Sequence, residues 1–296
     1  MGFKLFLLLE KFLMILPRSL RKGFFSFLAF LAYYISPRYR NVAFQNLDFA
    51  FNNTLSEEEK IKITKYSFKN LLLNFLHLME VKYMTKEELR KKVTFINVEA
   101  VKKVQAEGRS IVYVTPHYSA WELAGVANTL AVGKMTAVYK KMKNENFERW
   151  MLDSREIFGN ESLEKSNVIK PLIKLMRNTG ATVLVIDSAM SRGEGIEVEF
   201  MGKRTMQTPT PAYLSRKLNS AIIPSLVTTD DEENYTVEFF DEIIVEKTDD
   251  DKADILKATQ AQADWMTKII TDKPKFWFWI HRRWKGEYPE IYKRKS

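Results

Sequence analysis

Residues 110–133, SIVYVTPHYSAWELAGVANTLAVG, decide the fold because they join a short apolar run to a helical stretch. The run 110–116 is rich in β-branched residues, which is typical of a buried strand. Residues 120–133 have a helical pattern, and Gly133 ends it. Pro116 disfavours helix in the residue before it, so the chain is expected to turn after the strand. The stretch therefore predicts one strand–helix unit of an α/β protein.

The same alternation of strands and helices continues toward the C-terminus. Strands are predicted at 135–140, 181–187, 220–229 and 235–245, and helices at 98–107, 146–158, 167–178, 211–219 and 253–271. Strands joined by helices of this length form a parallel sheet that is covered on both faces. We therefore expect an α/β fold with a mostly parallel central sheet flanked by helices. Residues 41–296 would form a single domain, with a helical lead-in to about residue 95 in which Ser56 and Glu59 form a capping box.

Charge and composition narrow the functional classes. The 296 residues include 46 Lys and Arg, 37 Asp and Glu, and no cysteine. The absence of cysteine excludes disulfides, thiolate metal sites and cysteine nucleophiles. The basic residues gather at the two ends of the chain, whereas residues 230–254 hold twelve acidic residues and two lysines. This uneven distribution of charge along the chain favours contact with an anionic surface or substrate at a few places over binding of nucleic acid.

Residues 1–40 are apolar and basic, with seven Lys and Arg and one acidic residue. Glu10 and Lys11 interrupt the apolar region and no cleavage site follows, which argues against a signal peptide. The uninterrupted apolar run 24–35 is too short to span a bilayer as a helix. We expect membrane-associating helices that lie in the interface and meet anionic headgroups. Two alternatives are helices that dock on the protein's own core and one tilted span made of both pieces.

His117 directly follows the first predicted strand, and Glu122 lies five residues further on. In one continuous helix the two side chains would be about 140° apart, but a turn after Pro116 would allow the carboxylate to bind one imidazole nitrogen. The other nitrogen would then act as a general base, and backbone amides at the helix start would hold an oxyanion. A purely structural histidine is the alternative that the spacing leaves open.

Several blocks resemble the late acyltransferases of lipid A biosynthesis, which are membrane-bound enzymes that add secondary acyl chains to a lipopolysaccharide precursor. The stretch from His117 to Glu122 resembles their His-x-x-x-x-Asp/Glu motif. Four further blocks match in order along the chain, namely NVAFQNLDFAF (41–51), VYKKMKNENFERWMLDSREIFG (138–159), VIDSAMSRGEGIEVEFMGKRTMQTPTPAYLSRKL (185–218) and FWFWIHRRWK (276–285). The resemblance runs from about residue 40 to residue 285.

This resemblance implies a membrane-associated O-acyltransferase that moves a fatty acyl chain from acyl carrier protein or coenzyme A to a hydroxyl of a lipid A precursor or related glycolipid. It implies that His117 is the general base, that Glu122 orients it and that Arg155 contacts an oxyanion or a phosphate. The implied substrate-binding residues are Tyr139, Asn146, Asp187, Arg282, Arg283 and Lys285. No metal or cofactor is implied besides the thioester donor, and the implied location is the cytoplasmic face of a bacterial inner membrane.

The chain departs from the family pattern at two places. Lys140 and Lys141 replace an Arg-Pro pair, and residues 187–189 read Asp-Ser-Ala where the family has Asp-Gln-Asp. These changes bear on the identity of the acceptor more than on the chemistry. Two other functions remain open: a lipid esterase with Ser119 as nucleophile and His117 as base, and a non-catalytic lipid-binding protein on the same fold.

Three further segments have structural interpretations. His77 shares a helical stripe with Asn70 and Asn74, so we expect a buried structural histidine. The stretch 276–285 is expected either as a strand with core aromatics and solvated cations, or as a groove or membrane contact whose cations meet phosphates. The acidic segment 230–254 is expected to form a solvated hairpin that faces away from an acidic carrier protein and from a membrane.

Overall fold

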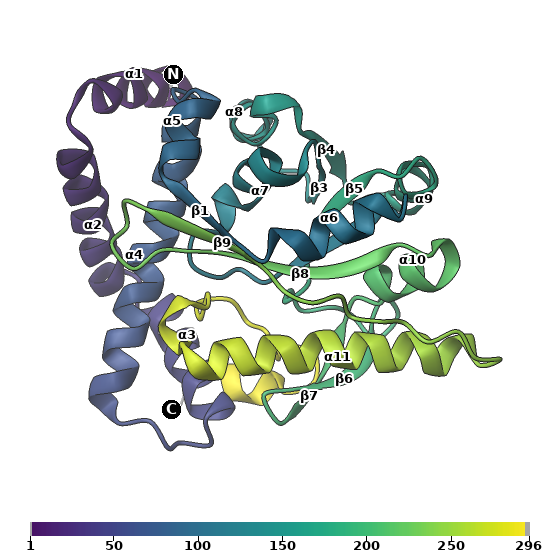
Figure 1. Cartoon of the computed structure of the whole chain (residues 1–296). Coiled ribbons are helices and arrows are strands. Elements are labelled where there is room, and N and C mark those ends of the chain that lie inside the picture. The colour runs from purple at the N-terminus through teal and green to yellow at the C-terminus, as the bar shows by residue number, and fades with distance from the viewer. Residues whose placement is uncertain (1, 294–296) are drawn as a thin grey trace.

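The computed structural model describes residues 2–293, and a seven-stranded sheet of order β1-β9-β8-β2-β5-β3-β4 lies at its centre (Figure 1). The strands are β1 (Val93–Ile96), β2 (Ile111–Thr115), β3 (Thr136–Tyr139), β4 (Glu161–Glu164), β5 (Ala181–Val185), β8 (Ala221–Thr228) and β9 (Tyr235–Phe239). The five neighbouring strands β8, β2, β5, β3 and β4 run parallel to one another. Strand β9 pairs antiparallel with β8, and β1 pairs parallel with β9. The predicted mostly parallel sheet is confirmed.

Helices cover both faces of this sheet, as Figure 1 shows. They are α6 (Val98–Ala106), α7 (Ala124–Val132), α8 (Glu145–Arg155), α9 (Ile169–Arg177), α10 (Thr210–Leu218) and α11 (Asp251–Asp272). Side chains of β2 alternate between two cores, because successive residues of a strand point to opposite faces. Ile111 and Tyr113 pack toward α6 and α7, and Val112 and Val114 pack toward α9, α10 and α11. All of β2 is therefore buried, which explains its uninterrupted apolar sequence.

Several elements were not predicted. The short strands β1 and β4 are only four residues long, and β4 lies at the sheet edge with the polar sequence ESLE. The antiparallel hairpin of β6 (Ile196–Phe200) and β7 (Lys203–Gln207) forms a separate two-stranded sheet beside α11. The expected C-terminal strand is wrong: a short 3-10 turn (Pro274–Phe276) leads into an irregular segment.

The helical lead-in consists of α3 (Pro37–Ala50), α4 (Glu57–Val81) and α5 (Lys86–Lys91). The capping box at the start of α4 is confirmed, because Ser56 and Glu59 bond each other's backbone amides. His77 on α4 is 4 % exposed, and its Nε2 lies 3.1 Å from the hydroxyl of Tyr235. Burial lowers the pKa of His77 to about 3, so the interpretation as a buried structural histidine is confirmed.

The N-terminal helices α1 (Gly2–Ile15) and α2 (Arg18–Ile35) pack on the rest of the protein with one face. Leu13 and Phe25 are buried in a cluster with residues of α4 and with Trp150 of α8. The buried Glu10 accepts a 2.9 Å hydrogen bond from the indole of Trp150. None of the helices within residues 2–293 is both long and apolar enough to cross a membrane.

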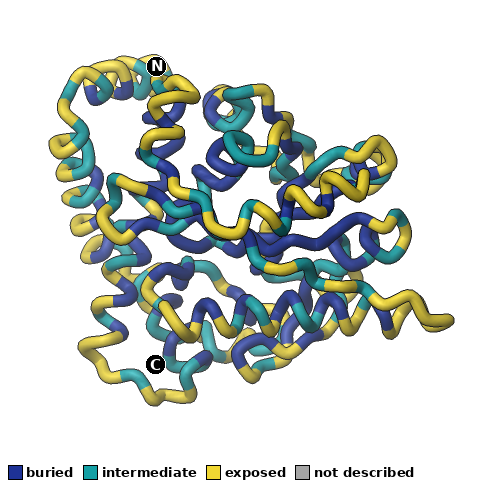
Figure 2. The backbone as a smooth tube through the Cα atoms, viewed as in Figure 1, coloured by how far each residue is buried: buried dark blue, intermediate teal, exposed yellow. Residues whose placement is uncertain are grey.

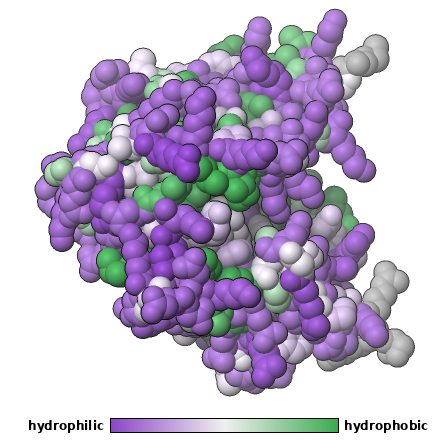
Figure 3. Space-filling model, turned by 90° about the vertical axis from the view of Figure 1, so that its right-hand side faces the viewer, coloured by the Kyte–Doolittle hydropathy of each residue, from purple (hydrophilic) through white to green (hydrophobic). Residues whose placement is uncertain are grey.

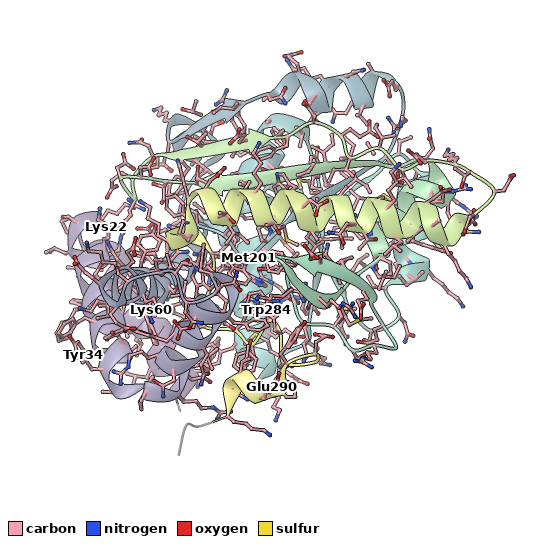
Figure 4. All side chains as sticks on the ribbon, turned by 90° about the horizontal axis from the view of Figure 1, so that it is seen from below. Lys22, Tyr34, Lys60, Met201, Trp284 and Glu290 are labelled. Carbon is pink, nitrogen blue, oxygen red and sulfur yellow. The ribbon has the colours of Figure 1, made fainter. Side chains whose placement is uncertain are left out.

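The opposite face of these two helices is exposed, as the yellow stretches along α1 and α2 in Figure 2 show, and it is largely apolar. Its exposed large side chains are Leu5, Leu8, Leu9, Phe12, Ile15, Leu20, Phe27, Phe30, Leu31, Tyr34 and Ile35. Tyr34 lies at the outer edge of the molecule in Figure 4. The helices thus combine docking on the core with an unpartnered apolar surface, which is unusual for a solvated face.

The acidic loop that joins β8 and β9 packs against α2, so this part of the segment is not wholly solvated. Its orientation relative to a carrier protein or a membrane stays a prediction. Glu233 forms ion pairs with Arg18 and with Lys22, the latter at 3.0 Å. Arg18 also donates to Glu80 at 3.1 Å and to the hydroxyl of Tyr235. These cations of α2 therefore bind the protein's own carboxylates and do not serve as free headgroup contacts.

Candidate active site

The carboxyl ends of the adjacent strands β2 and β5 bring a histidine and an aspartate together. Thr115 of β2 lies beside Val185 of β5, so the residues two positions further on, His117 and Asp187, face each other. Asp187 Oδ1 lies 2.8 Å from His117 Nδ1, and Oδ2 accepts a 2.9 Å bond from the His117 backbone amide. Such an edge is where α/β proteins place their sites.

Glu122 does not bind His117, contrary to the predicted dyad. Its two carboxylate oxygens accept bonds of 2.8 and 3.0 Å from Nη2 and Nε of Arg155. The turn after β2 was predicted, and Glu122 does lie in a first helical turn, that of a 3-10 helix (Trp121–Leu123). The Glu122 carboxylate binds the guanidinium of Arg155 on α8 instead of His117. The imidazole of His117 already has a carboxylate partner in Asp187, which follows β5.

Two asparagines of α4 hold the turn between His117 and Glu122. The side chains of Asn70 and Asn74 both donate to the carbonyl of Ser119, and Asn74 Oδ1 accepts from the Glu122 amide. Ser119 has a φ of +48°, a strained conformation that these contacts stabilise. The polar stripe in the largely apolar C-terminal half of α4 was the signal for this role, although sequence reasoning did not assign it.

Several backbone amides of this turn bond within the protein. The amide of Ser119 donates to Phe276, that of Ala120 to Val227 and that of Leu123 back to Ala120. With the Glu122 amide bound to Asn74, these four donors are not free for an oxyanion. The expectation that amides at the helix start supply the oxyanion contact therefore fails for these four.

The C-terminal aromatic segment packs beneath the pair of His117 and Asp187. Trp277 is fully buried and its indole donates to Asp187 Oδ2 at 2.8 Å, while the Phe278 amide donates to the carbonyl of His117. Asn46 of α3 anchors the segment by donating to the carbonyls of Trp279 and His281 at 2.7 Å. Neither Trp277 nor Asn46 was predicted as a site residue. Both lie in blocks that resemble the family motifs, and that was the available signal.

The tryptophans of this segment are interior, whereas Arg282 and Lys285 are exposed. Trp277, Trp279 and Trp284 are fully buried, and Figure 4 shows Trp284 among the side chains near the β6–β7 hairpin. Arg283 is also fully buried; its Nη1 donates to Thr205 Oγ1 at 3.0 Å and to the carbonyl of Met206 at 2.9 Å. The predicted phosphate contact through Arg283 is therefore wrong, because its guanidinium is buried and donates to residues of β7.

The ionisation of the pair follows from its surroundings. Burial lowers the pKa of His117, but the charge of Asp187 and the hydrogen bond to it outweigh burial, so the net pKa is raised. Burial alone would raise the pKa of Asp187, yet the neighbouring His117 holds it below its usual range. Asp187 is thus an ionised carboxylate that orients the imidazole and stabilises its protonated form.

His117, Glu122 and Arg155 line a cavity of about 840 Å³, within the range of roughly 300–1,000 Å³ typical of small-molecule sites. The rest of its wall is mostly apolar and includes Val126, Met135, Ala137, Met151, Leu172, Val183, Ile186, Ile196 and Ile255. Figure 3 shows hydrophobic surface recessed between hydrophilic rims on the side of the molecule that carries α9 and α10. His117 remains 31 % exposed, so its ring is accessible from the cavity.

The remaining predicted residues divide between the cavity and other places. Tyr139 lines the main cavity, and Arg282 and Lys285 line a second recess beside it. Asn146 lies exposed in the first turn of α8, and it is not part of either wall. Ser119 is fully buried, and its hydroxyl accepts from the Thr229 amide. The structure therefore does not place the hydroxyl of Ser119 in the cavity.

Within residues 2–293, His, Asp and Glu side chains form no group of three or more that could hold a metal ion. The fold and site together define an α/β protein in which an oriented histidine faces a deep cavity suited to an aliphatic chain. The chain matches the family described as bacterial lipid A biosynthesis acyltransferase over residues 2–286, and it belongs to that family.

Comparison with individual proteins gives distant relatives. The chain is 22% identical over 185 residues to the lipid A biosynthesis acyltransferase of Haemophilus influenzae, covering 62% of this chain and 58% of that protein. It is 24% identical over 200 residues to the phosphatidylinositol mannoside acyltransferase of Mycolicibacterium smegmatis, covering 66% and 64%. The lipid A biosynthesis palmitoleoyltransferase of Escherichia coli is 22% identical over 254 residues, covering 84% and 79%. The first two matches thus span about six tenths of those relatives.

Proposed function

We propose that this protein transfers a fatty acyl chain from a thioester of acyl carrier protein or coenzyme A to a hydroxyl of a lipid A precursor or related glycolipid. The observation that carries this proposal is the pair of His117 and Asp187 at the wall of the apolar cavity. The three relatives are named for acyl transfer, two for lipid A and one for a phosphatidylinositol mannoside. A glycolipid acceptor is the class that these names share.

In this proposal His117 is the general base. With Nδ1 held by Asp187, its Nε2 accepts the proton of the acceptor hydroxyl. The hydroxyl oxygen attacks the thioester carbonyl, and a tetrahedral oxyanion forms. When the carbon–sulfur bond breaks, the thiolate leaves and takes the proton from His117, which yields an ester and a free thiol. Asp187 stays ionised throughout and balances the charge of the imidazolium.

Arg155 is the proposed contact for the oxyanion. Glu122 binds its Nε and Nη2, which fixes the plane of the guanidinium. Nη1 makes no hydrogen bond to any described residue, and Arg155 lines the cavity. A donor held in advance at the place where charge develops is the most effective kind of electrostatic catalyst. Glu122 is thus a positioning residue for Arg155 and not the partner of His117.

The direct test uses purified protein with an acyl thioester and a glycolipid acceptor. We expect the mass of the acceptor to rise by one acyl group, with one thiol released per ester formed. Mass spectrometry of the lipid pool of cells with and without the active gene would give the acceptor and the chain length. Release of free fatty acid without acceptor, lost in Ser119→Ala, would favour an esterase. Lipid binding without turnover of any donor would favour a lipid-binding protein.

We further propose that the exposed apolar face of α1 and α2 rests in the interface of the bacterial inner membrane, on its cytoplasmic side. Ile15 is 82% exposed and Leu8 65%, so the face has no partner within residues 2–293. Lys4 and Lys11 on the same helix are exposed and form no ion pair there, which suits contact with anionic headgroups. Binding by this face would bring the acceptor lipid to the protein.

The membrane proposal predicts that removing this apolar face releases the protein. The triple variant Leu8→Gln, Phe12→Gln, Ile15→Gln should bind vesicles of phosphatidylethanolamine and phosphatidylglycerol on the order of a hundredfold more weakly, because each side chain loses about 1 kcal/mol or more of burial. Co-sedimentation measures the bound fraction.

The matched control replaces three exposed apolar residues elsewhere, Ile96, Ile244 and Leu256, by Gln. This control should bind vesicles as the unmodified protein does. Equal binding of both triple variants would contradict the proposed face. Substitution is preferable to deletion of α1 and α2, because their inner face covers Leu73 and Leu76 of α4.

A further inference from the structure

A second recess, of about 600 Å³, adjoins the main cavity and differs from it in charge. Four cationic side chains line it: Lys140, Lys165, Arg282 and Lys285. One acidic side chain, Glu194, lines it as well, so positive charge predominates. The recess is therefore a candidate site for an anionic group.

The fold brings these cations together from three places. Lys140 directly follows β3 and Lys165 directly follows β4, so the two stand at the carboxyl ends of neighbouring parallel strands. The Lys165 amide donates to the carbonyl of Tyr139 at 2.7 Å, which ties the two strand ends together. Arg282 and Lys285 come from the C-terminal segment that Asn46 anchors. The placement thus depends on the fold and not on one flexible loop.

None of the four cations forms an ion pair with a described carboxylate, although many lysines and arginines elsewhere in residues 2–293 do. Arg282 rests on the ring of Tyr292, with its guanidinium carbon 5.5 Å from the ring centre. Like charges gathered without partners repel one another, so an anion in the recess would relieve that repulsion. Lysines and arginines are also the usual protein groups that bind phosphate.

The recess opens into the main cavity, because Lys140, Lys165, Met190 and Glu194 line both. A ligand can therefore place an anionic group in the recess and an aliphatic chain or a reacting group in the cavity. Lys140 stands where the family resemblance leads one to expect an arginine, so a cation is kept at this position.

We propose that this recess binds a phosphate group of an acyl-transfer substrate. The inference rests on the proposed function, since it assigns the recess to a substrate of that reaction. Two sources carry the required chemistry: the phosphopantetheine arm of the donor and a phosphate of the glycolipid headgroup. Binding there would fix the substrate relative to His117 and act mainly on KM.

The test compares the double variant Lys140→Gln, Lys285→Gln with the control Lys103→Gln, Lys252→Gln, whose lysines are exposed and lie outside both cavities. For the donor, KM is measured with acyl-coenzyme A and with acyl-pantetheine, which lacks phosphate. For the acceptor, KM is measured with the phosphorylated glycolipid and with the same lipid after phosphatase treatment.

We expect KM to rise about tenfold for one phosphate-bearing substrate, with no change for its phosphate-free form or in the control variant. The substrate affected identifies the source of the phosphate. Unchanged KM values for both phosphate-bearing substrates would overturn the proposal. A loss seen only with acyl carrier protein, and with neither small substrate, would assign the lysines to the acidic surface of that carrier and would overturn it too.

A binding measurement keeps the recess separate from the reaction. Calorimetry with inorganic diphosphate should show binding to the unmodified protein and to the control, and binding about tenfold weaker to the double variant. If the protein transfers no acyl group but this difference is present, the proposed function fails and the anion site stands. If diphosphate binds all three proteins equally, the site fails whatever the protein catalyses.

Discussion

His117→Ala is expected to lower kcat for acyl transfer by about 10² to 10⁴, because the acceptor hydroxyl loses its general base. The effect should fall on kcat more than on KM, since His117 is proposed to accept a proton in the transition state and not to anchor either substrate. Steady-state rates with a saturating thioester donor and glycolipid acceptor would measure it.

The comparison variant is Ser119→Ala. Ser119 lies in the same turn, but its side chain is buried and bonded to the Thr229 amide, so the loss of its hydroxyl should leave kcat within a few fold of the unmodified protein. Thermal unfolding of both variants checks that they are folded. A His117→Ala protein of undiminished activity would rule out the proposed mechanism, and a Ser119→Ala protein as inactive as His117→Ala would point to the serine.

Much of the local structure around His117 could be predicted from the sequence. The apolar run of β2, the turn after Pro116 and the helix that follows depend on residues near one another in the chain. Glu122 was accordingly placed in the first helical turn. The partner of His117 was not predictable in the same way. It depends on which strand lies beside β2, and that neighbour, β5, leads to Asp187, which comes seventy residues after His117 in the chain.

The same limit explains the other errors. Asp187 was recognised as the residue that ends a buried strand, yet its three hydrogen bonds come from distant parts of the chain. Two are made by the backbone amide and Nδ1 of His117 in the turn after β2, and one by the indole of Trp277 in the C-terminal segment. Arg283 was expected to be solvated or to meet a phosphate, whereas the structure buries it and its Nη1 donates to Thr205 and Met206 inside the fold. Strand β4 at the sheet edge was missed because its sequence, ESLE, does not alternate between apolar and polar residues.

Asp187→Asn is expected to lower kcat on the order of 10³-fold and to move the pH profile. Asp187 accepts three hydrogen bonds: from His117 Nδ1, from the His117 amide and from the indole of Trp277. Asparagine offers one acceptor oxygen. If that oxygen serves the amide and the indole, its NH₂ group faces Nδ1 and forces the proton onto Nε2. In that tautomer Nε2 cannot accept the proton of the acceptor hydroxyl.

The sign of the pH effect follows from the charges. The base is neutral His117, so activity rises with pH through its pKa, which Asp187 raises above the ordinary value of about 6.5. In Asp187→Asn burial still lowers that pKa while the attracting charge is gone, so the rising limb of kcat/KM should move to lower pH. Arg155→Lys is the matched comparison, because it keeps a positive charge near His117. It should lower the maximum of kcat/KM by about 10²-fold and leave the pH of the rising limb unchanged. A limb that stays in place in Asp187→Asn would mean that another carboxylate, such as Glu122, sets the ionisation of His117.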